Sequence, residues 1–251
     1  MTADSESVPA AEALAAMRRF EVTPLPGLVG EGGLVVIAPH PDDESLACGG
    51  LISSACAEGR RVKVVVVSDG TGSHPRSRSY PRPRLRGLRE AEARQAVTAL
   101  GLAPRHLEFL RLPDRYVPSE GVAAEAAVES ITALAQSVAA TALFVSWRHD
   151  PHCDHQAAYR LARAAQRRTG AALYEYSVWG AALKPSAPVT SVNHGFRFGV
   201  GRHQLRKRRA ISAHRSQVSD LIADDPTGFR LSARDLARLS GPYESFVAGA
   251  E

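Results

Sequence analysis

The sequence predicts an α/β fold, a Rossmann-like three-layer sandwich with a mainly parallel sheet. Short apolar runs rich in β-branched residues alternate along the chain with longer segments that have helical spacing. Three of the helical segments are followed by glycine, the residue that best adopts the left-handed conformation after a last helical turn. Because strands buried on both faces are apolar throughout, this alternation favours helices on both sides of one sheet.

The first part of the chain predicts a βαβ unit. Residues 34–38 and 62–67 are continuous apolar runs, which are typical of buried parallel strands. Residues 44–58 lie between them and have helical spacing. Residues 1–30 are expected to form a partly ordered N-terminal extension, with little order in its first ten residues and one short helix at 11–20.

The same alternation continues towards the C-terminus. In order, the expected elements are a helix at 85–100, a strand at 106–110, a helix at 120–139, a strand at 142–146, a helix at 155–168, a strand at 172–176, a strand near 196 and a helix at 205–214. No linker or internal repeat divides the sequence, so residues 31–251 are expected to form a single domain. Residues 71–84 predict a long loop rich in Gly, Pro, Ser and Arg, and such loops are often binding loops.

Composition excludes several classes of protein. The sequence has no apolar run near the ~20 residues that cross a bilayer, so no transmembrane segment is expected. A basic region followed by an apolar stretch is missing from its start, which argues against a secretory signal and for a cytoplasmic location. Cys48, Cys56 and Cys153 lack CxxC spacing and predict reduced thiols, and neither a disulfide framework nor a thiolate zinc site.

The positive charge is concentrated in two segments. Residues 74–89 and 202–215 each carry six basic residues and no acidic one, and without those twelve charges the net charge of +5 becomes −7. This distribution favours a local contact with an anionic partner over a uniformly basic nucleic-acid surface. Solvated, flexible segments are an equally good interpretation of the same pattern.

Histidine and aspartate cluster directly after two of the predicted strands. His40, Asp42 and Asp43 follow the strand at 34–38, and His152 and His155 follow the strand at 142–146. In an open α/β sheet, ligands bind at the carboxyl ends of the strands, where such loops converge. Imidazole and carboxylate are good zinc ligands, and catalytic sites typically use three of them and keep one position for water. The pattern therefore predicts a metal-dependent hydrolase.

The residue types also suggest that neighbouring side chains have different chemical roles at this site. Of the adjacent Asp42 and Asp43, one carboxylate can bind the metal while the other accepts a proton from the activated water. His152 and His155 are three residues apart, so one can be a ligand and the other can face the substrate, and their spacing leaves the choice open.

Each of these residues also has an ordinary structural interpretation. Helix capping alone would explain Asp43 or Asp154, and Glu44 would complement the helix dipole. His149 is expected to be a surface residue. The catalytic interpretation is preferred because the alternative requires every one of these structural explanations to be true at once, in two separate loops.

Two functions of other classes compete with a hydrolase. A nucleotide-binding module would suit the predicted sheet, but residues 39–43 stand where the GxGxxG turn is expected, and two carboxylates would repel a pyrophosphate. A nucleic-acid-binding protein would use the two basic segments and would bind with a steep dependence on salt. Neither explains the clustered His and Asp residues, so no nucleic-acid partner is expected.

The motifs resemble those of a known family. His40-Pro41-Asp42-Asp43-Glu44 together with His152-x-Asp154-His155 is similar to the paired signature of the PIG-L/LmbE-like zinc-dependent N-acetylglucosaminyl de-N-acetylases. The resemblance covers about residues 34–176 and includes Arg89-x-x-Glu92, whereas Cys153 stands where many members have proline. Beyond residue 190 it is limited to single positions without an assigned role, namely Lys207, His214, Ser216 and Gln217.

The resemblance implies a role for each residue of the two motifs. His40, Asp43 and His155 would bind one Zn²⁺ or another divalent ion. Asp42 would be the general base, and His152 would stabilise the oxyanion or protonate the leaving amine, oriented by Asp154.

The substrate implied by the resemblance is a small N-acetylated amino sugar or its conjugate, with Arg89 in contact with sugar hydroxyls. The arginines of segment 74–89 favour an anionic, phosphorylated form of that substrate. Hydrolysis of another amide is the alternative, and the sequence leaves the oligomeric state open.

Overall fold

The computed structural model describes residues 6–249 and confirms the α/β fold predicted from the sequence. A seven-stranded sheet has the order β4-β3-β2-β5-β6-β9-β8. Its strands are β2 (Gly33–Ala38), β3 (Val62–Ser68), β4 (Leu107–Leu112), β5 (Ala140–Ser146), β6 (Ala172–Tyr176), β8 (Gly195–Gly199) and β9 (Tyr243–Ala248). The five strands from β4 to β6 are parallel, and β9 pairs antiparallel with both β6 and β8.

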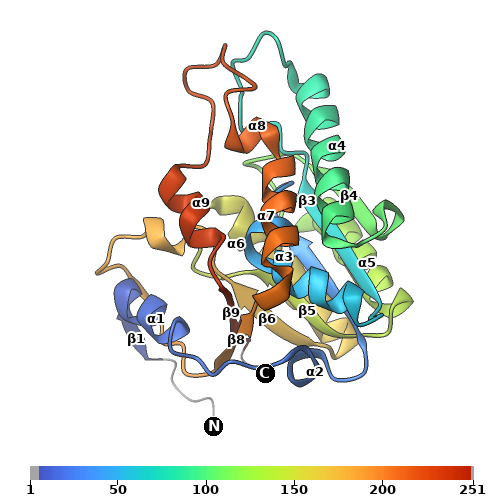
Figure 1. Cartoon of the computed structure of the whole chain (residues 1–251), viewed down its shortest axis with the longest axis vertical. Helices are drawn as coiled ribbons and strands as arrows, with labels where there is room; N and C mark the ends of the chain where they lie inside the picture. Colours follow the sequence, from blue (N-terminus) through green and yellow to red (C-terminus); the bar gives the residue numbers. More distant parts are fainter. Residues whose placement is uncertain (1–5, 250–251) are drawn as a thin grey trace.

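Helices cover both faces of this sheet and make the three layers (Figure 1). One face packs against α3 (Asp43–Ala57), α4 (Arg82–Leu100) and α7 (Gln204–Ala213), and the other against α5 (Gly121–Ser137) and α6 (Cys153–Thr169). Successive side chains of a strand point to opposite faces. On β2, Val36 therefore lies in the first core and Val35 in the second.

The N-terminal segment adds a small sheet and two short helices. β1 (Ser7–Pro9) pairs with β7 (Pro188–Thr190), and α1 (Ala10–Met17) and α2 (Leu25–Val29) follow β1. Part of the stretch expected to have little order thus forms a strand, while residues 1–5 lie outside the described residues. The division into an extension and a single domain stays a prediction.

The C-terminal third contains elements that the sequence did not predict. The expected strand near 196 and helix at 205–214 are present as β8 and α7. The additional elements are α8 (Arg215–Val218), α9 (Ala233–Leu239) and β9, and β9 inserts between β6 and β8. Within residues 6–249, none of the helices combines the length and the apolar character that crossing a bilayer requires.

The parallel strands bring the two His/Asp motifs together. β2 and β5 are direct neighbours in the sheet, with Val36 beside Phe144, and their carboxyl ends point the same way. The loops that follow these two strands therefore meet at one edge of the sheet. The three cysteines are free, as the sequence predicts, and Cys153 at the start of α6 is exposed.

Candidate active site

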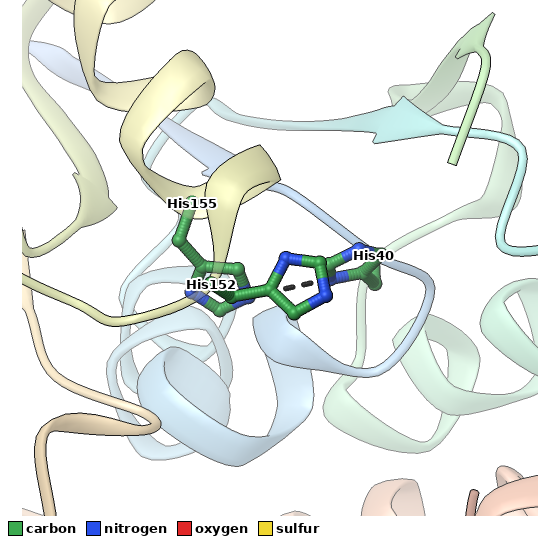
Figure 2. Close-up of side chains that lie close together, drawn as sticks. All are labelled: His40, His152 and His155. Atoms are coloured by element: carbon green, nitrogen blue, oxygen red, sulfur yellow. Dashed lines mark hydrogen bonds between the residues drawn. The ribbon is translucent and has the colours of Figure 1, made fainter. Parts of the chain in front are cut away.

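Three donor atoms form a compact triangle at this sheet edge. His40 Nδ1, Asp43 Oδ2 and His155 Nε2 lie 3.3 Å from one another in all three pairs. A tetrahedral zinc ion with bonds of about 2.0–2.1 Å separates its ligand atoms by about 3.3–3.4 Å. All three residues are buried, and Figure 2 shows His40 and His155 in contact beside His152 at the start of α6. The triangle has the donor types and the size for one divalent ion.

A wider set of ligands is also conceivable from the geometry. His40, His152 and His155 each offer a nitrogen within 4.8 Å of the others, and Asp114 and Asp154 form a similar group with His40. The donors of the His40–Asp43–His155 triangle are closer together than this limit. Their 3.3 Å spacing matches that of three ligands around one tetrahedral ion.

The electrostatics of the triangle favour a positive charge. Burial opposes ionisation of Asp43, but the neighbouring His155 and His40 rings hold the pKa of this carboxyl well below its usual range. Burial likewise lowers the pKa of His155, yet the Asp150 and Asp43 carboxylates outweigh it and raise that pKa to about 9. The carboxylates of the pocket therefore stabilise a positive charge between them. A divalent ion would supply that charge.

Carboxylates also lie beside the outer nitrogens of the two histidine rings. His40 Nε2 is hydrogen-bonded to Asp154 Oδ2 at 3.1 Å, whereas His155 Nδ1 lies 3.5 Å from Asp150 Oδ2, close enough for an ion pair but without a hydrogen bond. Metal-binding histidines usually have such a partner, which selects the tautomer and orients the ring. The Asp154 carboxylate thus contacts His40, whereas the family resemblance implied that Asp154 orients His152. Asp150 was not singled out from the sequence, although it lies in the same loop.

His152 caps helix α6 with its own side chain. Its Nδ1 accepts a hydrogen bond from the Asp154 N–H at 3.2 Å, so the ring proton of the neutral form is on Nε2. Burial and the nearby His40 and His155 rings lower the pKa of His152. The capping role considered for Asp154 therefore falls to His152, which faces the cavity as a neutral N–H donor, whereas α3 has no side-chain cap.

Asp42 is a buried carboxylate beside the triangle. Burial raises the pKa of Asp42 to about 6, with a further contribution from Asp43, against the opposing charges of Arg89 and His214. A carboxylate with a raised pKa is a better proton acceptor near neutral pH. Arg89 Nη2 lies 3.4 Å from Asp42 Oδ1.

Arg89 is buried and donates mainly to the backbone. Its Nη1 donates to the Gly70 carbonyl at 2.8 Å, and its Nη2 donates to the Pro41 carbonyl at 2.9 Å. These contacts hold the turn that precedes Asp42. Arg89 also lines the cavity, and its contact with a sugar hydroxyl stays a prediction.

A cavity of about 360 Å³ opens in front of these groups. Its walls combine the site residues with aromatic and polar side chains from other loops, among them Asp114, Arg115, Trp179, Gln217 and Phe229. The Trp179 and Phe229 rings meet edge to face, with centroids 5.6 Å apart. Of these wall residues, the sequence pointed to Gln217, without a role, and gave no sign of Arg115, Trp179 or Phe229. Asp114 could have been suspected because it closely follows β4 at the same sheet edge.

The C-terminal segment completes one side of the cavity. The Phe229 N–H donates to the Ser73 carbonyl at 2.7 Å, and the Asp224 carboxylate accepts hydrogen bonds from the backbone of Arg78 and Ser79. The predicted long loop is therefore fastened to residues 224–229. Gly72 and Ser73 of this loop line the cavity, whereas Arg78 is exposed.

Comparison with known proteins gives one family and several related folds. Residues 35–166 match the family described as PIG-L: GlcNAc-PI de-N-acetylase. No curated protein matches the chain significantly. The solved N,N'-diacetylchitobiose deacetylase from Pyrococcus horikoshii, in complex with an inhibitor, is 19% identical and aligns over 87% of this chain and 84% of its own, with a TM-score of 0.64.

Two further solved structures are informative. The zinc-inhibited form of teicoplanin deacetylase is 18% identical, over 86% of this chain and 97% of its own, with a TM-score of 0.62. The 4-carboxy-2-hydroxymuconate hydratase from Pseudomonas putida is 17% identical, over 72% of this chain and 78% of its own, with a TM-score of 0.57. Identities this low establish the shared fold alone. The family match, however, spans more than half of the chain, from β2 into α6, and the chain belongs to the GlcNAc-PI de-N-acetylase (PIG-L) family.

Proposed function

We propose that this chain is a metal-dependent hydrolase that removes the N-acetyl group from an amino sugar or its conjugate. The observation that carries the proposal is the 3.3 Å triangle of His40, Asp43 and His155 donors beside the Asp42 carboxylate and the His152 ring. This is a three-ligand site with a base and a hydrogen-bond donor around one cavity. Zn²⁺ is the ion that best suits two imidazoles and one carboxylate in this geometry.

A divalent ion held by the triangle would supply Lewis acidity to the acetamide carbonyl and to the attacking water. Asp42 accepts the proton of that water as the new C–O bond forms. His152 donates its Nε2–H to the carbonyl oxygen, which becomes negatively charged. When the C–N bond breaks, Asp42 returns the proton to the leaving nitrogen, so the products are acetate and a free amine.

The shape of the cavity supports a sugar as substrate. A pyranose has an apolar C–H face and a rim of hydroxyls, which suit an aromatic wall and hydrogen-bonding groups, respectively. Trp179 and Phe229 provide the aromatic wall, and Asp114 and Gln217 provide polar groups. The deacetylases of similar fold include an enzyme named for diacetylchitobiose. The hydratase of similar fold means that the fold alone does not select the reaction, and the proposal rests on family and site.

Acetate release tests this function. The zinc-loaded protein is expected to release acetate from at least one member of a panel of N-acetyl amino sugars, disaccharides and sugar phosphates. Removal of the ion with a chelator should abolish the activity, and adding Zn²⁺ back should restore it. Activity that survives complete chelation would refute the metal dependence. If the zinc-loaded protein leaves every member of the panel intact but cleaves another amide, the protein is an amidase of different specificity.

The same assay tests whether the substrate is anionic. If the exposed arginines of segment 74–89 recognise phosphate, kcat/KM at low salt should be higher for a phosphorylated N-acetyl sugar than for its neutral form. The difference should shrink as salt is added. Equal values at low salt would assign these arginines to the solvated surface.

A further inference from the structure

A second buried polar cluster lies behind Asp42 and takes no part in the mechanism above. Glu44 is 0% exposed and His214 is 1% exposed, although they are 170 positions apart in the sequence. Glu44 belongs to the first turn of α3, and His214 lies at the junction of α7 and α8. Two ionisable side chains this deeply buried need specific partners, because removing charge from water is costly.

The Glu44 carboxylate connects His214 to the backbone of Asp42. Its Oε2 accepts the Asp42 N–H at 3.0 Å, and its Oε1 accepts from His214 Nε2 at 2.9 Å. The Ser45 hydroxyl donates to the same Oε1 at 2.7 Å. The Glu44 side chain therefore does more than complement the helix dipole, which was the role expected from the sequence.

The ring of His214 is attached through one nitrogen. In the described part of the chain, Nδ1 has no hydrogen-bond partner, so the polar contacts of the ring are all made at Nε2. The Asp42 N–H is shared with the His40 carbonyl, also at 3.0 Å. Glu44 and His214 thus act on the turn that carries both His40 and Asp42.

We infer that Glu44 and His214 are positioning residues that hold the Asp42 carboxylate in line with the metal triangle. This inference rests on the proposed function, because it assigns Asp42 as the base. Through this pair, the C-terminal segment contributes to catalysis without touching the substrate. His214 fixes the Glu44 carboxylate, and Glu44 fixes the backbone of Asp42. An offset of about 1 Å between a catalytic group and its target can lower turnover by on the order of 10²-fold.

A second ion pair offers a matched control. Lys207 Nζ lies 2.6 Å from Glu244 Oε1, and the Glu244 carboxylate accepts the N–H groups of Gly50 and Leu51 in α3. Lys207 and Glu244 are each about as buried as His214 and also join the C-terminal segment to α3. This pair bonds the middle of α3, away from Asp42, so its loss reports on stability alone.

The experiment compares His214→Ala, His214→Gln and Lys207→Met as zinc-loaded proteins. His214→Ala is expected to lower kcat by about 10- to 100-fold, with KM and metal content unchanged. His214→Gln keeps one N–H donor at a reach similar to Nε2 and should recover most of kcat. Lys207→Met should lower the melting temperature but keep kcat close to that of the wild type. If His214→Ala does not fold, Glu44→Gln replaces it in the comparison.

Two outcomes would overturn the inference. One is a His214→Ala enzyme with wild-type kcat, and the other is a Lys207→Met enzyme that loses as much kcat as His214→Ala does. A wild-type protein that releases no acetate refutes the proposed function instead. The inference is then decided by hydrogen exchange of the peptide that contains Asp42, which should be faster in His214→Ala than in Lys207→Met. Equal exchange in both would refute it.

Discussion

Replacing His155 with alanine is expected to abolish metal binding and to lower acetate release by on the order of 10³-fold or more. The ring supplies one corner of the 3.3 Å triangle and is fully buried. Its loss also leaves the Asp43 and Asp150 carboxylates without the imidazole between them. Elemental analysis of the purified variant, together with its turnover, measures both effects.

His149 provides the control for this substitution. It is a histidine of the same loop that is partly buried, and its Nε2 accepts the Thr190 N–H at 3.1 Å, outside the triangle. His149→Ala should keep stoichiometric zinc and near wild-type turnover. His152→Ala should also keep the metal but lose activity. A His155→Ala protein that retains one zinc per chain would contradict the ligand assignment, and a metal-free His152→Ala protein would mean that the two histidines exchange roles.

Replacing Asp42 with asparagine is expected to leave metal and fold intact while lowering kcat by about 10²- to 10⁴-fold. Asparagine has nearly the same shape but cannot accept the proton of water. Burial raises the pKa of Asp42 to about 6, and the charge of a bound ion would lower it. The wild-type pH–rate profile should therefore lose activity at or below about pH 6, as Asp42 becomes protonated.

Zinc content and the pH–rate profile check this prediction together. The acid limb of the profile should be absent from the residual activity of Asp42→Asn. A variant with full zinc and a rate close to that of the wild type would remove Asp42 from the mechanism. A variant that loses zinc would instead make Asp42 part of the metal site.

The sequence predicted the part of the site that depends on strand order. Continuous apolar runs identified β2 and β5 as buried parallel strands, and parallel neighbours place their following loops at one edge. His40 and His155 therefore come together although 115 positions separate them. The ligand choice between His152 and His155 needed the family resemblance, because spacing along a helix start allows both.

Side-chain partners in the loops could not be predicted in the same way. His152 accepts the Asp154 N–H because α6 begins at Cys153, two residues before the start that would make Asp154 its N-cap. The Asp154 carboxylate then points at His40, a contact that depends on the loop that contains Arg115. Hydrophobic periodicity carries no information about such contacts.

The sequence carries the least information about how the C-terminal segment contributes to the cavity and the sheet. β9 has a charged residue, Glu244, at a buried position, so its sequence lacks the apolar pattern of an inner strand. Phe229 lies in an irregular segment, and Gln217 lies in the four-residue helix α8. Short elements and loops give little periodic signal, so their place at the cavity follows only from the folded chain.

The position of a bound ion is the sharpest test of the His40–Asp43–His155 triangle. Crystals of the zinc-loaded protein, measured on both sides of the zinc absorption edge, should show one anomalous peak at about 2.0–2.2 Å from His40 Nδ1, Asp43 Oδ2 and His155 Nε2. A peak held by His152, Cys153 and Asp154, or a zinc-loaded crystal without a peak at the triangle, would refute the assignment of the three triangle residues as ligands.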